Sequence, residues 1–115
     1  MRRDDLIRLF HMRDAACEAL SFIEGKSRTD LNTNRMLVLS LVKDIEIIGE
    51  AAVKISKETV GQLSQIPWAE IIGMRNRLIH AYFEVDLDVL WKTAIEDVPS
   101  LIEELRKVIP SEELQ

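Results

Sequence analysis

The sequence predicts an all-α protein, folded as an up-and-down four-helix bundle. Helix-favouring residues dominate the 115-residue chain, which contains only four glycines and three prolines. Apolar residues recur every three or four positions over long stretches, and no stretch alternates as a strand would. A chain of this length can bury a core of its own, so residues 1–115 are expected to form a single helical domain.

The first helix is expected from Asp4 or Asp5 to Glu24, with Gly25 as its stop. Residues 25–34 are typical of a loop, in which Asp30 or Thr33 can cap the next helix. The apolar positions of the first helix are Leu6, Leu9, Phe10, Ala16, Cys17, Leu20 and Ile23.

A second helix is expected over residues 34–58, where apolar side chains step by four and three along one seam. Gly49 lies in its middle, with Ala51 and Ala52 close to it, which predicts the close approach of another backbone. The charged residues of another face are interpreted as a solvated surface with a weak Glu50–Lys54 pair. The seam residues are Leu41, Ile45, Ile48, Ala52 and Ile55.

Residues 59–66 are expected to connect to a third helix that begins at Pro67 and continues to residue 83. The fourth helix is expected to begin at Asp86 as its cap, and its apolar phase continues through Pro99. Since proline removes the hydrogen bond to the Ile95 carbonyl, we expect either one helix kinked at Pro99 or two nearly coaxial segments, the second forming a short fifth helix.

The net charge of −5 argues against binding nucleic acid over the whole surface. Residues 1–81 nevertheless carry 12 Lys and Arg against 11 Asp and Glu, whereas residues 82–115 carry 3 against 9, so a local basic cleft is permitted. Cys17 is the lone cysteine; it is interpreted as a small buried hydrophobe and the protein as cytoplasmic. Neither a membrane span nor a signal peptide is expected.

The stretch MRNRLIHAYF, residues 74–83, contains an arginine where an apolar side chain is expected. On a helical projection Arg75 falls in the middle of the apolar stripe, and Arg77 falls on the opposite, solvated side. A buried guanidinium is costly unless it is paired, so Arg75 either forms a structural ion pair with Glu46 or Glu50 or lies in a wet cleft. The same choice applies to Arg13, with more weight on the structural role.

Arg75 and His80 together offer a permanent cation for a phosphate and a group that transfers protons near neutral pH. Asn76, one turn before His80, can hydrogen-bond the imidazole. Residues five apart are separated by roughly 140° around a helix, so one helix cannot easily direct both side chains at one phosphate. Either the helix ends near His80, or two copies of the chain share a site in a symmetric homodimer.

The segment Arg75-Asn-Arg-Leu-Ile-His80-Ala-Tyr82 resembles the Arg-x4-His-x-Tyr signature of the HepT-like toxins, which belong to the HEPN superfamily of helical ribonucleases. The likeness extends to IGEA at 48–51, PWAEIIGMRNRLIHAYF at 67–83, VDLDVLW at 85–91 and DVP at 97–99. It covers nearly the whole chain and is strongest over residues 66–99.

The resemblance implies a homodimeric endoribonuclease that needs no metal or other cofactor and acts as the toxin of a toxin–antitoxin system. Arg75 and His80 would be catalytic and Asn76 supporting, with a 2′,3′-cyclic phosphate as the expected product. The implied antitoxin is a nucleotidyltransferase of the MNT type that attaches AMP to Tyr82. The alternatives are a non-enzymatic helical scaffold for such a nucleotidyltransferase, and a plain interaction bundle.

Overall fold

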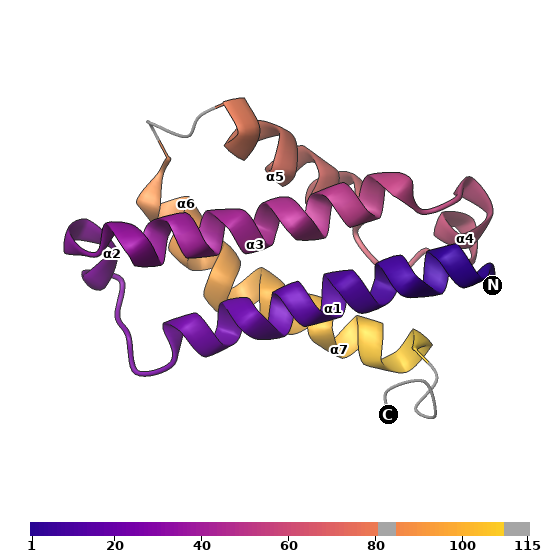
Figure 1. Ribbon diagram of the computed structural model, residues 1–115, viewed down its shortest axis with the longest axis horizontal. Helices are drawn as coiled ribbons and strands as arrows, with labels where there is room; N and C mark the ends of the chain where they lie inside the picture. Colours follow the sequence, from indigo (N-terminus) through magenta and orange to yellow (C-terminus); the bar gives the residue numbers. More distant parts are fainter. Residues whose placement is uncertain (81–84, 110–115) are drawn as a thin grey trace.

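The computed structural model describes residues 1–80 and 85–109, without the side chains of residues 78–80. Its regular elements are all helical within those ranges, which confirms the all-α prediction. The long helices are α1 (Arg3–Ile23), α3 (Arg35–Lys54) and α5 (Trp68–His80), followed by a final rod that begins with α6 (Leu87–Lys92). The chain reverses direction from each of these to the next, as an up-and-down bundle requires (Figure 1).

The final rod is a composite of three helical segments. After α6 comes a π-helical turn, η1 (Thr93–Asp97), and then α7 (Val98–Val108), which carries Pro99 in its first turn. The wide turn lies next to the position where proline cannot donate a hydrogen bond. A change of helical form therefore lies beside Pro99, where either a kink or a boundary between two segments was expected, and the π-helical turn is the feature that the sequence did not specify.

Short helices occupy two of the expected loops. A helix α2 (Asp30–Thr33) precedes α3. The cap of α3 is therefore Asn34, whose side chain accepts a hydrogen bond from the Leu37 amide. The prediction that Asp30 or Thr33 caps this helix is wrong. Gly25 has a φ of 72°, as the predicted helix stop requires.

The second predicted helix, 34–58, is also too long. Its helix α3 ends at Lys54, and a separate helix α4 (Lys57–Gln62) follows where a connector was expected. Ser56 is the N-cap of α4, because its hydroxyl accepts a hydrogen bond from the Thr59 amide; the same hydroxyl donates a hydrogen bond to Asp5 of α1.

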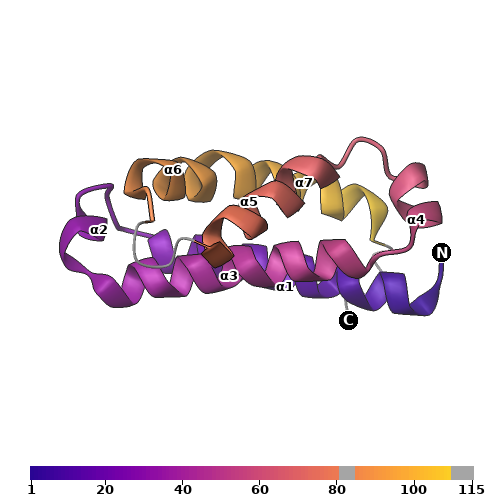
Figure 2. The ribbon, with the colours of Figure 1, turned by 90° about the horizontal axis from the view of Figure 1, so that it is seen from above.

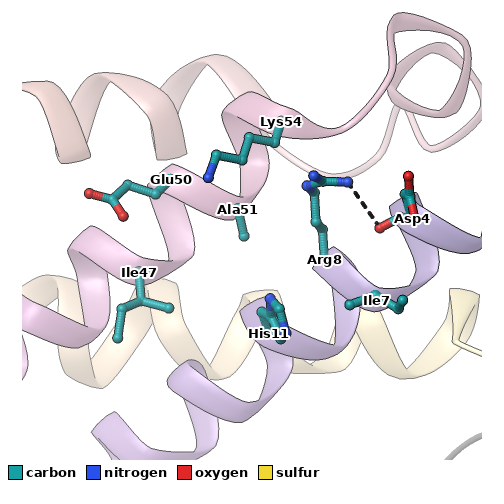
Figure 3. A pocket seen from close by; sticks show the side chains of 8 residues that line it. All are labelled: Asp4, Ile7, Arg8, His11, Ile47, Glu50, Ala51 and Lys54. Carbon is teal, nitrogen blue, oxygen red and sulfur yellow. Dashed lines mark hydrogen bonds between the residues drawn. The ribbon is translucent and has the colours of Figure 1, made fainter.

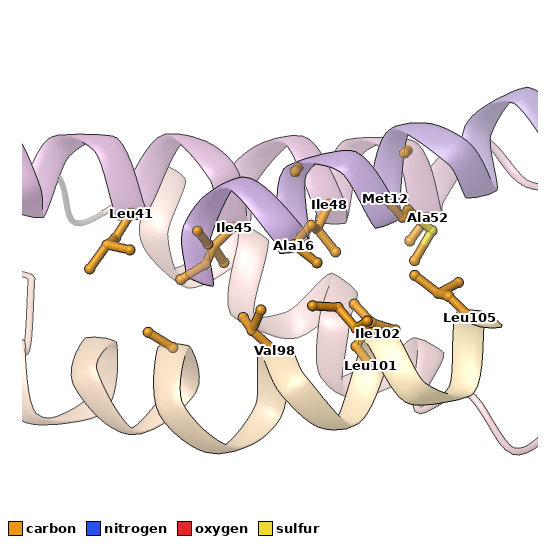
Figure 4. Close-up of a cluster of buried hydrophobic side chains, with 14 of the residues drawn as sticks. Met12, Ala16, Leu41, Ile45, Ile48, Ala52, Val98, Leu101, Ile102 and Leu105 are labelled. Atoms are coloured by element: carbon orange, nitrogen blue, oxygen red, sulfur yellow. The ribbon is translucent and has the colours of Figure 1, made fainter. Parts of the chain in front are cut away.

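The core lies between α1, α3 and α7 (Figure 4), and Figure 2 shows the final rod running along α1 and α3. The face that α3 turns to the core includes Leu41, Ile45 and Ile48, each at most 5% exposed. Helix α5 packs mainly on α3 and has few contacts with the final rod. The side chains drawn in Figure 4 include Met12, Ala16, Ala52, Val98, Leu101, Ile102 and Leu105.

Cys17 is exposed, so the prediction of a buried thiol is wrong. Its neighbour Ala16 takes the core-facing position on α1, which turns Cys17 toward solvent beside Leu20. Among the residues that the structure describes, no helix has the length and hydropathy to cross a membrane.

Candidate functional site

Arg75 lies on α5 at the point where this helix crosses α3. A β-carbon added to Gly49 of α3 would lie 2.5 Å from Cγ of Arg75, closer still to its Cβ, and 3.5 Å from its Cα. The two helices can approach this closely because residue 49 has no side chain. The predicted close approach of another backbone at Gly49 is therefore confirmed, and the residue that comes close to Gly49 is Arg75.

The Arg75 guanidinium is half-buried and bound to its neighbour. Its Nη1 donates a hydrogen bond to Oδ1 of Asn76 over 2.8 Å, and its buried Nε has no hydrogen-bond partner. Between described residues, the ion pairs join Arg13 to Asp14, Arg28 to Asp88 and Lys107 to Glu104.

Arg75 is therefore not part of an ion pair with any described carboxylate, Glu50 included. The structural pairing with Glu50 that the sequence left open is therefore absent. Arg13, in contrast, pairs with Asp14 at 2.7 Å and lies over the Phe10 ring, 5.1 Å from its centre. These contacts support the structural role for Arg13.

The other predicted site residues are described only in part. Asn76 is exposed, and its Oδ1 accepts a hydrogen bond from Arg75; the predicted hydrogen bond between Asn76 and His80 falls on a side chain outside the described residues. His80 is the last described residue of α5, and its imidazole lies outside the description, as does the whole of Tyr82. The choice between a helix that ends near His80 and a site shared by two copies therefore stays open.

A cavity of about 710 Å³ lies between α5, α3 and the final rod. Its walls include apolar side chains such as Ile48, Met74 and Leu101, and charged groups stand at Glu70, Arg77 and Asp97. The cavity reflects the sparse contacts between α5 and the final rod. One flank of α5 is therefore only partly covered within the described part of a single chain.

A second hollow, between α1 and α3, was not predicted (Figure 3). Arg8 and His11 of α1 face Lys54 of α3 across it. The signal was present in the sequence, because Asp4, Arg8 and His11 follow one another by four and three on one helical face. The sequence interpretation assigned Lys54 to a solvated surface and gave no role to the two α1 residues.

The fold and site define a small all-α bundle in which a helix presents an arginine in a half-open setting, five residues before a histidine. A model of the family described as "Ribonuclease HepT-like" matches residues 12–108, and the chain belongs to this family.

Several relatives match most of the chain. The "Probable ribonuclease HepT" of Thermococcus cleftensis is 41% identical over 104 residues, which cover 84% of this chain and 94% of the relative. A protein of Methanocaldococcus jannaschii provisionally named RNase MJ1380 is 33% identical over 107 residues, covering 93% of this chain and 98% of the relative. A protein of Caldanaerobacter subterraneus provisionally named RNase TTE0752 is 36% identical over 97 residues, covering 84% and 87%. No solved structure gave a significant match.

Proposed function

We propose that the protein is an endoribonuclease whose site is centred on Arg75 and His80. The observation that supports this most directly is the state of Arg75: a half-buried guanidinium, in no ion pair with a described carboxylate, whose Nε donor is buried and unbonded. The Nη donors of the guanidinium that are not bonded to Asn76 are left for a phosphate. The names of the relatives agree with this chemistry.

In the proposed reaction the ribose 2′-oxygen attacks the adjacent phosphorus, and the bond to the 5′-oxygen of the next nucleotide breaks. His80 takes the 2′-hydroxyl proton or protonates the leaving 5′-oxygen, and His80 of the partner subunit takes the complementary role. Arg75 stabilises the charge that builds on the phosphorane oxygens. Asn76 holds the guanidinium through the 2.8 Å bond, and its amide NH₂ is available for the phosphate or the imidazole. The products are a 2′,3′-cyclic phosphate and a 5′-hydroxyl, and no metal takes part.

The test compares single variants on RNA. Arg75→Ala and His80→Ala should each abolish cleavage by the purified protein, whereas Lys43→Ala should retain it. Lys43 is the control because it is an exposed cation of α3 that lines neither the cavity beside α5 nor the hollow between α1 and α3. Wild-type cleavage rates in purified His80→Ala would refute the assignment.

We further propose that two copies share the site. The uncovered flank of α5 supports this, since a cavity of about 710 Å³ beside it gives a second copy a surface to cover. Mixing inactive Arg75→Ala with inactive His80→Ala should restore part of the activity if subunits exchange, because some sites then contain one intact arginine and one intact histidine. Light scattering that gives a monomer mass would contradict the shared site.

The proposed biological role is that of a cytoplasmic toxin restrained by an MNT-type nucleotidyltransferase, which would transfer AMP to Tyr82. AMP on that phenol would add bulk and negative charge seven residues after Arg75, and so compete for the cation. Incubation with the nucleotidyltransferase and ATP should add one AMP per chain, located at Tyr82 by mass spectrometry. A scaffold without enzymatic activity would instead leave RNA uncut by the wild-type protein alone.

A further inference from the structure

The hollow between α1 and α3 brings basic side chains from two helices to one place. Arg8 and His11 come from α1 and Lys54 from the last turn of α3, and the space between them has a volume of about 270 Å³. In Figure 3 the ends of Arg8 and Lys54 lie on either side of Ala51, with His11 nearby. We refer to this hollow, lined by Asp4, Ile7, Arg8, His11, Ile47, Glu50, Ala51 and Lys54, as the α1–α3 groove.

The cations of the groove are not neutralised by direct ion pairs. Arg8 donates a hydrogen bond to the backbone oxygen of Asp4 over 3.3 Å, and neither Arg8 nor Lys54 is in an ion pair with a described carboxylate. The expected Glu50–Lys54 pair does not form, and Figure 3 shows the Glu50 carboxylate directed away from Arg8. Two cations and an imidazole are therefore free to receive an anion.

Asp4 and Glu50 also border the groove, which limits its affinity for a single small anion. The ligand that suits weak, distributed positive charge is a polyanion that makes several such contacts at once. The small floor residue Ala51 and the apolar neighbours Ile7 and Ile47 leave room beside the cations for a sugar and base.

The groove lies across α3 from Arg75. Gly49 of α3 contacts Arg75, while Glu50 and Ala51, the next two residues, line the groove. The two places are therefore separated by the width of one helix, about 10–12 Å. A strand only a few nucleotides long can extend from one to the other.

We propose that the α1–α3 groove binds the phosphate backbone of single-stranded RNA on one side of the nucleotide cleaved at Arg75 and His80. This inference rests on the proposed ribonuclease function. Arg8 and Lys54 act by charge, which makes their contribution independent of base sequence. The groove holds the substrate and takes no part in bond cleavage.

The experiment measures binding of a 2′-O-methyl oligoribonucleotide, which cannot be cleaved, by fluorescence anisotropy at several KCl concentrations. The double variant Arg8→Gln/Lys54→Gln should raise the Kd about tenfold near 0.1 M salt and reduce the slope of log K against log[KCl] by about 1.4, for two lost phosphate contacts. Each single variant should produce about half of that change in slope. Lys43→Gln, an exposed cation of α3 outside the groove, should bind as wild type does.

A second measurement does not depend on the groove variants folding. The chain has two histidines, so in untagged His80→Ala protein the only imidazole is His11. Its NMR ring signals should move when the oligonucleotide is added. Ring signals that stay fixed while RNA binds, or a double variant with wild-type Kd and salt slope, would overturn the proposal.

The groove proposal and the cleavage-site proposal can be contradicted independently of each other. If the double variant binds normally while Arg75→Ala no longer cleaves RNA, the groove proposal is wrong and the proposed function stands. If the double variant binds weakly while Arg75→Ala cleaves at the wild-type rate, the groove binds RNA but the proposed cleavage site is wrong.

Discussion

Asp44 is a buried carboxyl group on α3 whose replacement should stabilise the protein. It is 1% exposed, and its Oδ2 has no hydrogen-bond partner. Burial raises the pKa of Asp44 from 3.8 to about 7, assisted by a hydrogen bond with Glu18 and by that residue's negative charge. The carboxyl is therefore protonated in the folded protein at pH 5 and becomes a buried, uncompensated anion above pH 7.

The sign of the pH dependence follows from proton binding. Between pH 4 and 7 the folded state holds a proton at Asp44 that the unfolded chain has lost, so this residue makes stability fall as pH rises. A difference of about 3 pKa units corresponds to about 4 kcal/mol, lost across that interval and constant above it. Asp44→Asn keeps the size of the side chain and removes the charge. It should exceed the wild-type free energy of unfolding by about 1–2 kcal/mol at pH 5 and by about 4 kcal/mol at pH 8.

The assay is urea unfolding followed by circular dichroism at pH 5, 6, 7 and 8. The difference between Asp44→Asn and wild type reports Asp44 together with its interaction with Glu18, because the remaining titrating residues are common to both proteins. Asp14→Asn is the control, since this carboxylate is 65% exposed and its ion pair with Arg13 should contribute less than about 1 kcal/mol. A difference that is zero or negative at pH 8 would refute the assignment of a buried acid to residue 44.

Two further predictions concern contacts that fix the helices. Burial alone would raise the pKa of Asp5, but hydrogen bonds from Ser56 and Thr59 outweigh this effect and lower the pKa to about 2. The carboxylate therefore adds about 2 kcal/mol to the free energy of unfolding above pH 4, and this stability is lost as the pH falls toward 2. Asp5→Asn should remove this pH-dependent loss of stability in acid. Gly49→Ala should lower the free energy of unfolding by about 1–3 kcal/mol, because its Cβ would overlap Arg75, and should also reduce RNA cleavage. Gly73→Ala, where the added methyl meets open space, should leave stability unchanged or raise it by up to about 1 kcal/mol, as thermal unfolding of both variants would show.

The long helices could be predicted because their cause is local. Apolar spacing and the residues at helix ends act within a few positions of the chain. Gly25 follows the end of α1 and Asp86 caps the start of α6, as expected. The helix α4 could not be predicted in this way, since its start depends on Asp5, which is 51 residues from Ser56 in the sequence. Asp5 itself looked like an ordinary acidic residue of a first helical turn, yet it is buried.

The candidate site was predicted unevenly for a similar reason. Arg75 was identifiable because a charge in an apolar stripe is visible on one helix. The α1–α3 groove depends on two helices whose facing residues are 36 or more positions apart in sequence, as with His11 and Ile47. The sequence likewise gave no sign that Asp44 is buried, since this residue lies at the edge of the α3 stripe and only the position of α1 decides that it is covered.

Gly49 connects the packing of the bundle to the proposed chemistry. A larger residue at position 49 would move α5 away from α3, and the Cα and Cβ of Arg75 would then lie further from the point where the two helices cross. With glycine, the first two carbons of the arginine side chain occupy the space of the missing side chain, so the guanidinium extends from a fixed base and is held again by Asn76. A cation restrained in this way loses less conformational entropy when it meets a phosphate than a free surface arginine does. Glycine 26 positions before Arg75 is therefore part of what defines the site, although it carries no chemical group of its own.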